Sequence, residues 1–202
     1  MHPNPVFHTK EAQDNLAYAA SRAFGVLAVN GEAGPLMSHI PFLVDGDDLW
    51  LHLVRSNPIA RALQDPLPAR IAVSGPDSYV SPDWYGVPDQ VPTWNYVAVH
   101  IVGILERRAP EELRGVIDRQ SAFFEEKLAP KPEWRSEKMT PVVLDKMMRM
   151  ICPCKLAISD VQGTWKLNQN KPDDVRLRAA DAIEADGIGT ELKALAGLMR
   201  DA

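Results

Sequence analysis

Two hairpin signals near the N-terminus constrain the fold of this chain most strongly. Apolar stretches of strand length at residues 24–29, 36–44 and 49–54 are separated by Asn30-Gly31 and by Asp45-Gly46. These dipeptides tolerate the positive φ angles of tight hairpin turns. The sequence therefore predicts an antiparallel meander of three strands in this region.

Further periodic segments extend the meander. We expect strands at residues 70–74, 94–105 and 155–160, and helices at 10–23 and 59–63, in an insertion at about 110–150 and in a C-terminal tail at about 172–202. About six antiparallel strands with peripheral helices favour a β-rich α+β fold. A small closed or nearly closed barrel is expected, since closure removes exposed sheet edges. The length of 202 residues suits one domain over residues 1–202.

Composition limits the function classes. The net charge is −5, with 22 Lys and Arg against 27 Asp and Glu, so no overall basic field favours direct binding of nucleic acid. Residues 1–10 lack the apolar core of a signal peptide, and no apolar run reaches the length of a membrane span. We therefore expect a cytoplasmic protein without a membrane segment.

The strand predicted from Trp94 onward has two different faces. Val97, Val99 and Ile101 alternate on one face, as a core strand requires. The other face carries Tyr96 and His100, together with the indole of Trp94. Such a mixture suits a crevice that holds a planar, partly polar ligand, although core packing or a subunit contact would explain the aromatic side chains equally well.

The end of the third predicted strand is suited to an anion. Arg55, Ser56 and Asn57 come directly before Pro58, which is typical of the first position of a helix. Backbone N–H groups at a helix start, with a guanidinium and two short polar side chains beside them, favour a phosphate. Ser-Asn-Pro also occurs in loops for turn formation alone, so both interpretations stay open.

Two other polar segments are candidates. Ser38 and His39 are neighbours on a predicted strand, so only one of the two side chains can face a given cleft. Residues 165–171 contain amides and cations without an acidic side chain, and Lys166 and Gln169 could donate to a polar ring edge or a phosphate. A solvated turn before the last helices is the alternative.

The cysteines and the remaining histidines do not indicate a metal site. Cys152 and Cys154 flank Pro153, and two thiols cannot complete a closed zinc site. Buried reduced thiols are expected instead. Hydrolase, nucleotide-hydrolysis and dinucleotide-binding motifs are absent from the sequence.

Four segments together resemble a known family. HLVRSNP, GPDSYVSPDWYG, VPTWNYVAVHIVG and KLNQNK follow one another in this order, and their pattern is similar to that of the FMN-binding negative transcriptional regulators, the PaiB-like family of bacteria. The resemblance extends from about His2 to the helix after Lys171. It implies an FMN-binding antiparallel split β-barrel that forms a homodimer, with the flavin at the subunit contact.

The resemblance also implies roles for particular residues. Arg55, Ser56 and Asn57 match the segment that holds the FMN phosphate in related split barrels. The other matching positions lie beside the flavin ring or its polar edge: Ser38, His39, Trp94, Asn95, Lys166 and Gln169. Asn168 stands where the family more often has serine, and the Cys-Pro-Cys segment also departs from the family pattern.

The fold does not choose between functions, because split barrels serve several chemistries. By family resemblance, we expect an FMN-binding, redox-responsive negative regulator of transcription, with indirect or weak contact to DNA. The alternative is an FMN-dependent oxidoreductase, in which His39 or His100 would be a candidate proton donor. A haem-binding split barrel is a third possibility, although no haem attachment motif is present.

Overall fold

The computed structural model describes residues 1–202, which form two compact units. We call residues 17–72 and 101–161 the barrel unit, and residues 1–16, 73–100 and 162–202 the terminal unit. Three long strands contribute residues to both units, namely β4 (Leu67–Val80), β5 (Thr93–Arg107) and β6 (Ile151–Lys166). Helix α1 (Ala12–Arg22) also has residues in both.

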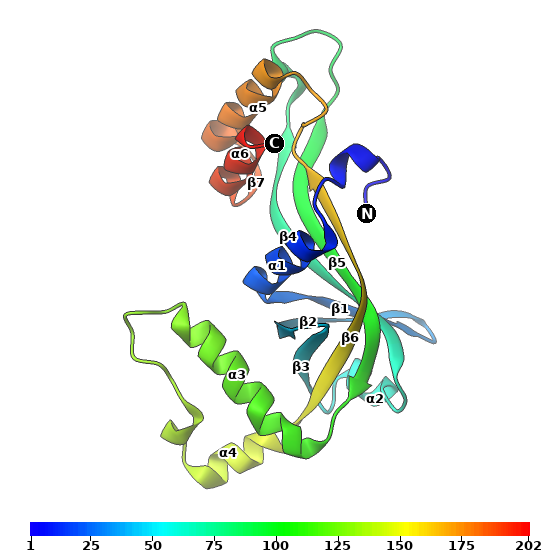
Figure 1. Cartoon of the computed structure of the whole chain (residues 1–202), viewed down its shortest axis with the longest axis vertical. Coiled ribbons are helices and arrows are strands. Elements are labelled where there is room, and N and C mark those ends of the chain that lie inside the picture. Colours follow the sequence, from blue (N-terminus) through cyan, green and yellow to red (C-terminus); the bar gives the residue numbers. More distant parts are fainter. The chain divides into compact units, whose positions relative to one another are not determined.

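The barrel unit is a ring of antiparallel strands (Figure 1). The meander comprises β1 (Phe24–Gly31), β2 (Gly34–Asp45) and β3 (Asp48–Val54). The sheet order is β1-β2-β3-β6-β5-β4-β7, and β1 also pairs with β4 in a register that matches Val26 with Ala72. Because this additional pairing returns the sheet to its first strand, the predicted β-rich α+β fold with a split β-barrel is confirmed.

Alternation along the strands builds the core of the barrel unit. Leu49, Leu51 and Leu53 of β3 are buried, while the residues between them are partly exposed. In the register of β3 with β6, Leu51 pairs with Cys154 and Leu53 with Cys152. The two cysteines are free and buried, as expected from the sequence. They act as small apolar residues of the barrel interior.

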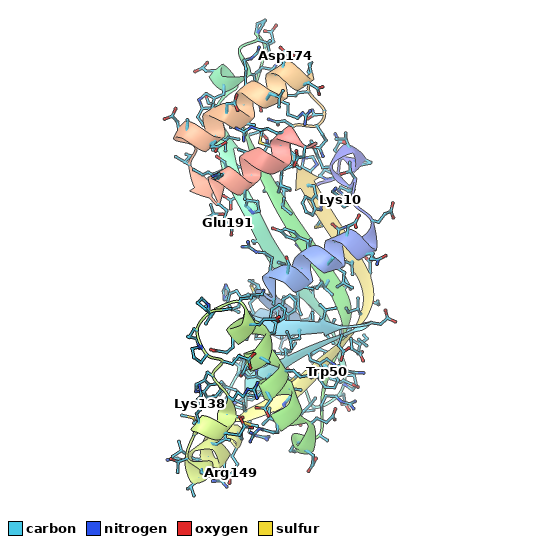
Figure 2. All side chains as sticks on the ribbon, turned by 60° about the vertical axis from the view of Figure 1, so that its left-hand side comes forward. Lys10, Trp50, Lys138, Arg149, Asp174 and Glu191 are labelled. Atoms are coloured by element: carbon cyan, nitrogen blue, oxygen red, sulfur yellow. The ribbon has the colours of Figure 1, made fainter.

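Helices between β5 and β6 cover part of the barrel strands. This segment contains η3 (Pro110–Glu112), α3 (Leu113–Glu126), η4 (Ser136–Lys138) and α4 (Pro141–Met148). The short helix α2 (Pro58–Ala62) lies outside the segment, between β3 and β4. Helix α3 packs against β2 and β3. Figure 2 labels Trp50 on β3 and Arg149 directly after α4.

The terminal unit has its own small core. It contains η1 (Pro5–Phe7), η2 (Pro82–Tyr85), α5 (Asp173–Asp186), β7 (Gly189–Thr190) and α6 (Leu192–Arg200). Helices α5 and α6 pack on each other, and the buried guanidinium of Arg176 donates to the Met199 carbonyl at 2.6 Å. That bond satisfies one of the carbonyls left unpaired at the end of α6.

Two strands are longer than the sequence suggested. Strand β4 continues through Gly75 to Val80, where we expected a loop, and β6 continues past Asp160 to Lys166. At Gly163 a Cβ would lie 1.9 Å from Oδ1 of Asn15, and that same oxygen accepts from Nε1 of Trp165 at 2.8 Å. Glycine in β6 therefore reflects a close approach of a side chain rather than the end of a strand.

No helix of the chain is long and apolar enough to cross a bilayer. The interpretation of residues 1–202 as a single domain with a helical insertion and tail stays a prediction.

Candidate functional site

The turn after β3 joins two of the predicted site residues. Asn57 is the N-cap of α2, because its Oδ1 accepts from the Ile59 N–H at 2.9 Å. Its Nδ2 donates to Oγ of Ser38 at 3.0 Å. Ser38 lies on β2, so the amide of Asn57 fixes the turn to the neighbouring strand while it caps the helix. Ser56 is exposed at the same turn.

Arg55 extends from this turn toward the end of α4. Its backbone N–H donates to the Met150 carbonyl at 2.9 Å, and its Nε donates to the Arg149 carbonyl at 2.9 Å. No ion pair with an acidic side chain involves its guanidinium. Two of its nitrogens therefore remain available as donors for an anion.

A cavity of about 520 Å³ lies beside Arg55. Two further cations, Arg114 and Arg149, line it together with Glu111 and Asp145. Its apolar wall is formed by Leu113, Leu144 and Met148. Because three guanidinium groups face two carboxylates, and Arg114 is already paired with Asp118 at 2.6 Å, Arg55 and Arg149 are the cations open to an added anion.

His39 lies on the opposite face of β2 from its neighbour, as strand alternation predicted. Its ring stacks on Phe24, with the centroids 6.3 Å apart and the planes inclined by 27°. Both side chains are exposed. The pair gives the outer surface of β1 and β2 a flat aromatic patch.

Trp94 and Asn95 differ strongly in exposure within the terminal unit. The Trp94 side chain is 47% exposed and meets Tyr79 edge to face at 6.4 Å. Asn95 is buried, its Nδ2 donates to Sδ of Met199 at 3.3 Å, and its Oδ1 has no hydrogen-bond partner. An unpaired buried oxygen of this kind is unusual in native proteins.

Gln169 is fully occupied in holding its own segment together. Its Oε1 accepts from the Leu167 N–H at 2.8 Å, and its Nε2 donates to the carbonyls of Trp165 and Val6 at 2.6 and 3.1 Å. Asn168 has a φ of 63°, a left-handed conformation that asparagine accepts more readily than serine. The structure thus gives a backbone reason for asparagine at this position.

Lys166 also has partners within the terminal unit. Its ammonium donates to Oγ1 of Thr93 and lies 5.8 Å from the centroid of the Phe7 ring. Burial lowers the pKa of Lys166 below its ordinary value. Lys166 and Gln169 therefore lie in one segment of the terminal unit, whereas the strand-end residues belong to the barrel unit.

The cysteine pair shows opposite pKa shifts. The hydrogen bond between the two thiols and burial both raise the pKa of Cys154. The same hydrogen bond, opposed by burial and helped by the charges of Arg107 and Arg55, lowers the pKa of Cys152. Both side chains are at most 1% exposed, so neither thiol is accessible as a nucleophile. No group of three or more potential metal-ligating side chains is present in the structure.

Sequence reasoning missed Arg114 and Arg149, which line the cavity from the helical segment. Arg149 is 94 residues from Arg55 in the chain, and no local pattern links the two positions. The only available signal was the density of cations in the segment that follows β5.

The chain is similar to flavin-related proteins. Residues 1–160 match the family described as "Putative FMN-binding domain". Over 199 residues the chain is 25% identical to "Protease synthase and sporulation protein PAI 2" of Bacillus subtilis, covering 96% of this chain and 94% of that protein.

Two solved structures share the fold. The FAD and heme binding protein of Mycobacterium smegmatis aligns with a TM-score of 0.55 at 22% identity, over 90% of this chain and 80% of that one. The flavocytochrome Anf3 of Azotobacter vinelandii aligns with a TM-score of 0.56 at 16% identity, over 85% and 79%. The match over residues 1–160 shows that this chain belongs to the family of FMN-binding domains, with FMN as its cofactor, as the sequence resemblance predicted.

Proposed function

We propose that the FMN phosphate binds at the turn after β3, with Arg55 as its main contact. The observation that carries this proposal is the pair of uncommitted donors on Arg55 beside a cavity of about 520 Å³. Ser56 would add a hydroxyl, and Asn57 would keep the turn rigid through its cap and its bond to Ser38. Charge-assisted bonds from a guanidinium to a phosphate are among the strong polar contacts of proteins.

The remaining predicted residues are assigned to the ring of the flavin. His39 offers an exposed imidazole on the outer face of β2, and Trp94 offers a half-exposed indole. Asn95 offers an oxygen without a partner, while Lys166 and Gln169 would first have to release present contacts. Contributions from two subunits of a homodimer would complete the ring site. Bound FMN would supply reversible acceptance of electrons.

We propose that the protein acts as a redox-responsive negative regulator of transcription rather than as a catalyst. Family membership supports FMN binding, and the similarity to a sporulation protein of Bacillus subtilis supports a regulatory role. The net charge of −5 favours an effect through a partner protein or through a local basic patch. An oxidoreductase is the alternative to be tested against it.

The phosphate assignment is tested by titrating FMN and riboflavin into the wild-type protein and the Arg55→Ala variant. Loss of the charged contacts is expected to lower the affinity for FMN by about 30-fold, because such a bond contributes about 2 kcal/mol. Riboflavin, which has no phosphate, should bind both proteins equally. Arg61→Ala removes an exposed cation of α2 and is the matched control. Equal losses for the two ligands would reject the assignment.

The regulatory proposal is tested with the flavin-loaded protein in its oxidised and reduced states. A regulator should change its retention of target DNA, alone or with a partner from the same cell, between the two states. Anaerobic mixing with NADH or NADPH tests the alternative, because rapid bleaching of the flavin would indicate an oxidoreductase. Sedimentation with and without FMN measures whether the protein is a dimer.

A further inference from the structure

A second cavity, of about 410 Å³, lies in the barrel unit where α3 covers the outer face of β2 and β3. Its walls are largely apolar and include Ile117, Phe124 and Trp134, with Pro41 at the strand side. His52 also lines it. This cavity shares no lining residue with the cavity beside Arg55. It is therefore a separate candidate for binding a small molecule.

A buried amide fixes which ring nitrogen of neutral His52 carries the proton. The side chain of Gln120 is nearly fully buried, and its Nε2 lies 3.3 Å from the carbonyl oxygens of both Pro41 and Trp50. Because those oxygens can only accept, the amide nitrogen must point toward them. Oε1 of Gln120 is then the atom 2.9 Å from Nδ1 of His52, so Nδ1 carries the proton and donates.

This arrangement leaves Nε2 of His52 as an acceptor. In a neutral imidazole only one nitrogen is protonated, so Nε2 keeps its lone pair. No side chain or backbone group donates to it. His52 is only partly exposed and lines the cavity. The cavity thus combines a largely apolar lining with an imidazole acceptor whose direction and tautomer are held by the fold, and Ser121 and Glu125 also line it.

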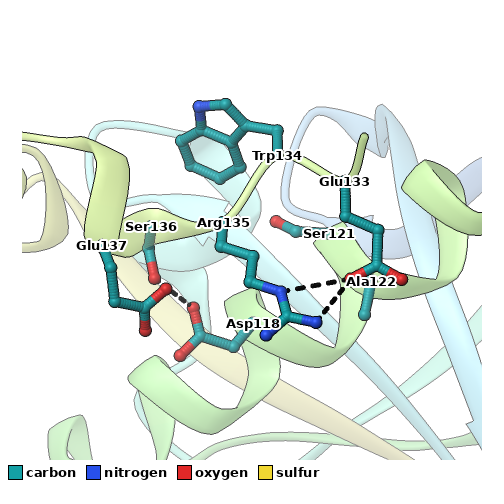
Figure 3. A pocket seen from close by; sticks show the side chains of 8 residues that line it. All are labelled: Asp118, Ser121, Ala122, Glu133, Trp134, Arg135, Ser136 and Glu137. Carbon is teal, nitrogen blue, oxygen red and sulfur yellow. Dashed lines mark hydrogen bonds and ion pairs between the residues drawn. The ribbon is translucent and has the colours of Figure 1, made fainter. Parts of the chain in front are cut away.

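The backbone at Trp134 is also held in position. Its N–H donates to a carboxylate oxygen of Glu125 at 2.7 Å, and the same carboxylate is bonded by Lys131. In Figure 3 the indole lies on the other side of its segment from the carboxylates of Asp118 and Glu137. Phe124 and Trp134 both line the 410 Å³ cavity and give it an aromatic wall.

The smaller cavity drawn in Figure 3 serves as a contrast. It has about 190 Å³ and shares Ser121 and Trp134 with the 410 Å³ cavity, but each of its charged residues has an ion-pair partner. Arg135 binds Glu133 at 2.9 Å, and the Ser136 hydroxyl donates to Asp118 at 2.7 Å. A site whose polar groups are already satisfied offers little to a ligand, whereas His52 retains an acceptor.

We infer that the 410 Å³ cavity binds a small aromatic molecule whose N–H or O–H group donates to Nε2 of His52 while its ring packs on Phe124 and Trp134. Aromatic ligands suit walls of this kind because offset or edge contacts add to the gain from apolar burial. A single donor on the ligand would pair Nε2 of His52, which otherwise has no partner. The inference does not rest on the proposed regulatory function.

The test uses indole and 1-methylindole, which differ in one N–H group. Each is titrated calorimetrically into the full chain at pH 8, with and without saturating FMN. Indole is expected to bind the wild-type protein about tenfold more tightly, the value of one hydrogen bond of ordinary strength. FMN should leave the affinity for indole unchanged.

Two variants locate the binding. His52→Phe should bind both probes with equal affinity, because it retains an apolar ring and loses the acceptor. Trp134→Ala should weaken both probes together. The matched controls are His8→Phe and Trp84→Ala, which change the same residue types in the terminal unit and should behave as the wild type.

Several results would overturn the inference. Failure of indole to bind, or equal binding of the two probes to the wild-type protein, would exclude a directed donor contact. Competition between indole and FMN would assign the cavity to the flavin instead. The wild-type comparison of the two probes does not depend on the folding of any variant, so the inference stays falsifiable if His52→Phe is unstable.

Discussion

Two donor-rich segments of this chain look alike in sequence and differ in what their donors do. The turn at Arg55, Ser56 and Asn57 has a guanidinium with unpaired nitrogens beside a cavity. The segment containing Lys166 and Gln169 has its amide bonded to three backbone groups and its ammonium placed on Thr93. A segment suited to ligand binding is thus distinguished by its unused donors, not by its composition.

The difference lies in how many polar groups of each side chain have a partner. Gln169 bonds to Trp165 and Leu167, which are close in sequence, and to Val6, which is 163 residues away, so its amide oxygen and nitrogen are both used. Arg55 meets a carbonyl 94 residues away and keeps only one side-chain bond. The nitrogens of Arg55 that have no partner are the groups that a ligand can use.

Replacing Gln169 should have the largest effect. Gln169→Ala removes three hydrogen bonds and is expected to lower the free energy of unfolding by about 3 kcal/mol, at about 1 kcal/mol for each bond. Affinity for FMN, measured well below the unfolding temperature, should fall only modestly, because Gln169 would have to release its present bonds before it could contact the flavin ring. Thermal unfolding and FMN titration of the same sample measure both quantities. A large loss of FMN affinity in a folded Gln169→Ala protein would show that the segment binds the cofactor directly.

Asn57→Ala should have a smaller effect on stability and a clear effect on binding. The variant loses the cap of α2 and the bond to Ser38, which is expected to cost about 1.5 kcal/mol. Because the turn becomes less rigid, the affinity for FMN should fall as well. Ser38→Ala removes the bond to Asn57 and keeps the cap of α2, so denaturant unfolding of the two variants separates the two contributions. Unchanged FMN affinity in both would mean that the turn needs no rigid support.

Arg149→Ala tests the second arginine of the cavity that is available to bind an anion. Its carbonyl contact to Arg55 is made by the backbone and survives the substitution. FMN is expected to bind about fivefold more weakly, which corresponds to about 1 kcal/mol for an added charge at partial exposure. Fluorescence titration at two salt concentrations should show a weaker salt dependence than the wild type. A loss as large as that of Arg55→Ala would place the phosphate nearer α4.

Lys166→Met should have the smallest effect, confined to alkaline pH. Burial lowers the pKa of Lys166 from an ordinary value of 10.5, so the unfolded state binds more protons than the folded state just below that value. Stability from this group therefore rises as the pH rises through the lowered pKa toward 10.5. The variant should lack this rise in denaturant unfolding measured against pH. An identical profile in both proteins would contradict the assigned burial.

Most strands could be predicted because their signals are local. Alternating burial identifies β1, β2 and β3 without reference to distant residues. The predicted turn positions were wrong by one or two residues: Asn30 and Gly31 still pair with β2, so the turns lie at Glu32-Ala33 and at Gly46-Asp47. The extension of β4 past Gly75 could not be predicted, since glycine and proline there resemble a turn. Both are buried in the folded chain, and their strand conformation reflects tertiary packing that propensity does not report.

The site could be predicted only in part for the same reason. Arg55 and Asn57 were identifiable from the helix start that follows them, and Ser38 from its strand. The bond between Ser38 and Asn57 joins positions 19 residues apart, and Arg149 comes from a separate helical segment. Contacts between residues that are distant in the sequence produce no periodic pattern, so a single sequence does not predict them.

The bond from Arg55 to the carbonyl of Arg149 has a mechanical consequence. An anion bound by the two free nitrogens of the guanidinium would leave the Nε donor on that carbonyl, so one side chain would hold the ligand and also seal the C-terminal turn of α4. The backbone bond from Arg55 to Met150 still anchors the chain. Occupancy of the cavity would thereby restrain one helix end, and amide hydrogen exchange at the end of α4 can follow this restraint.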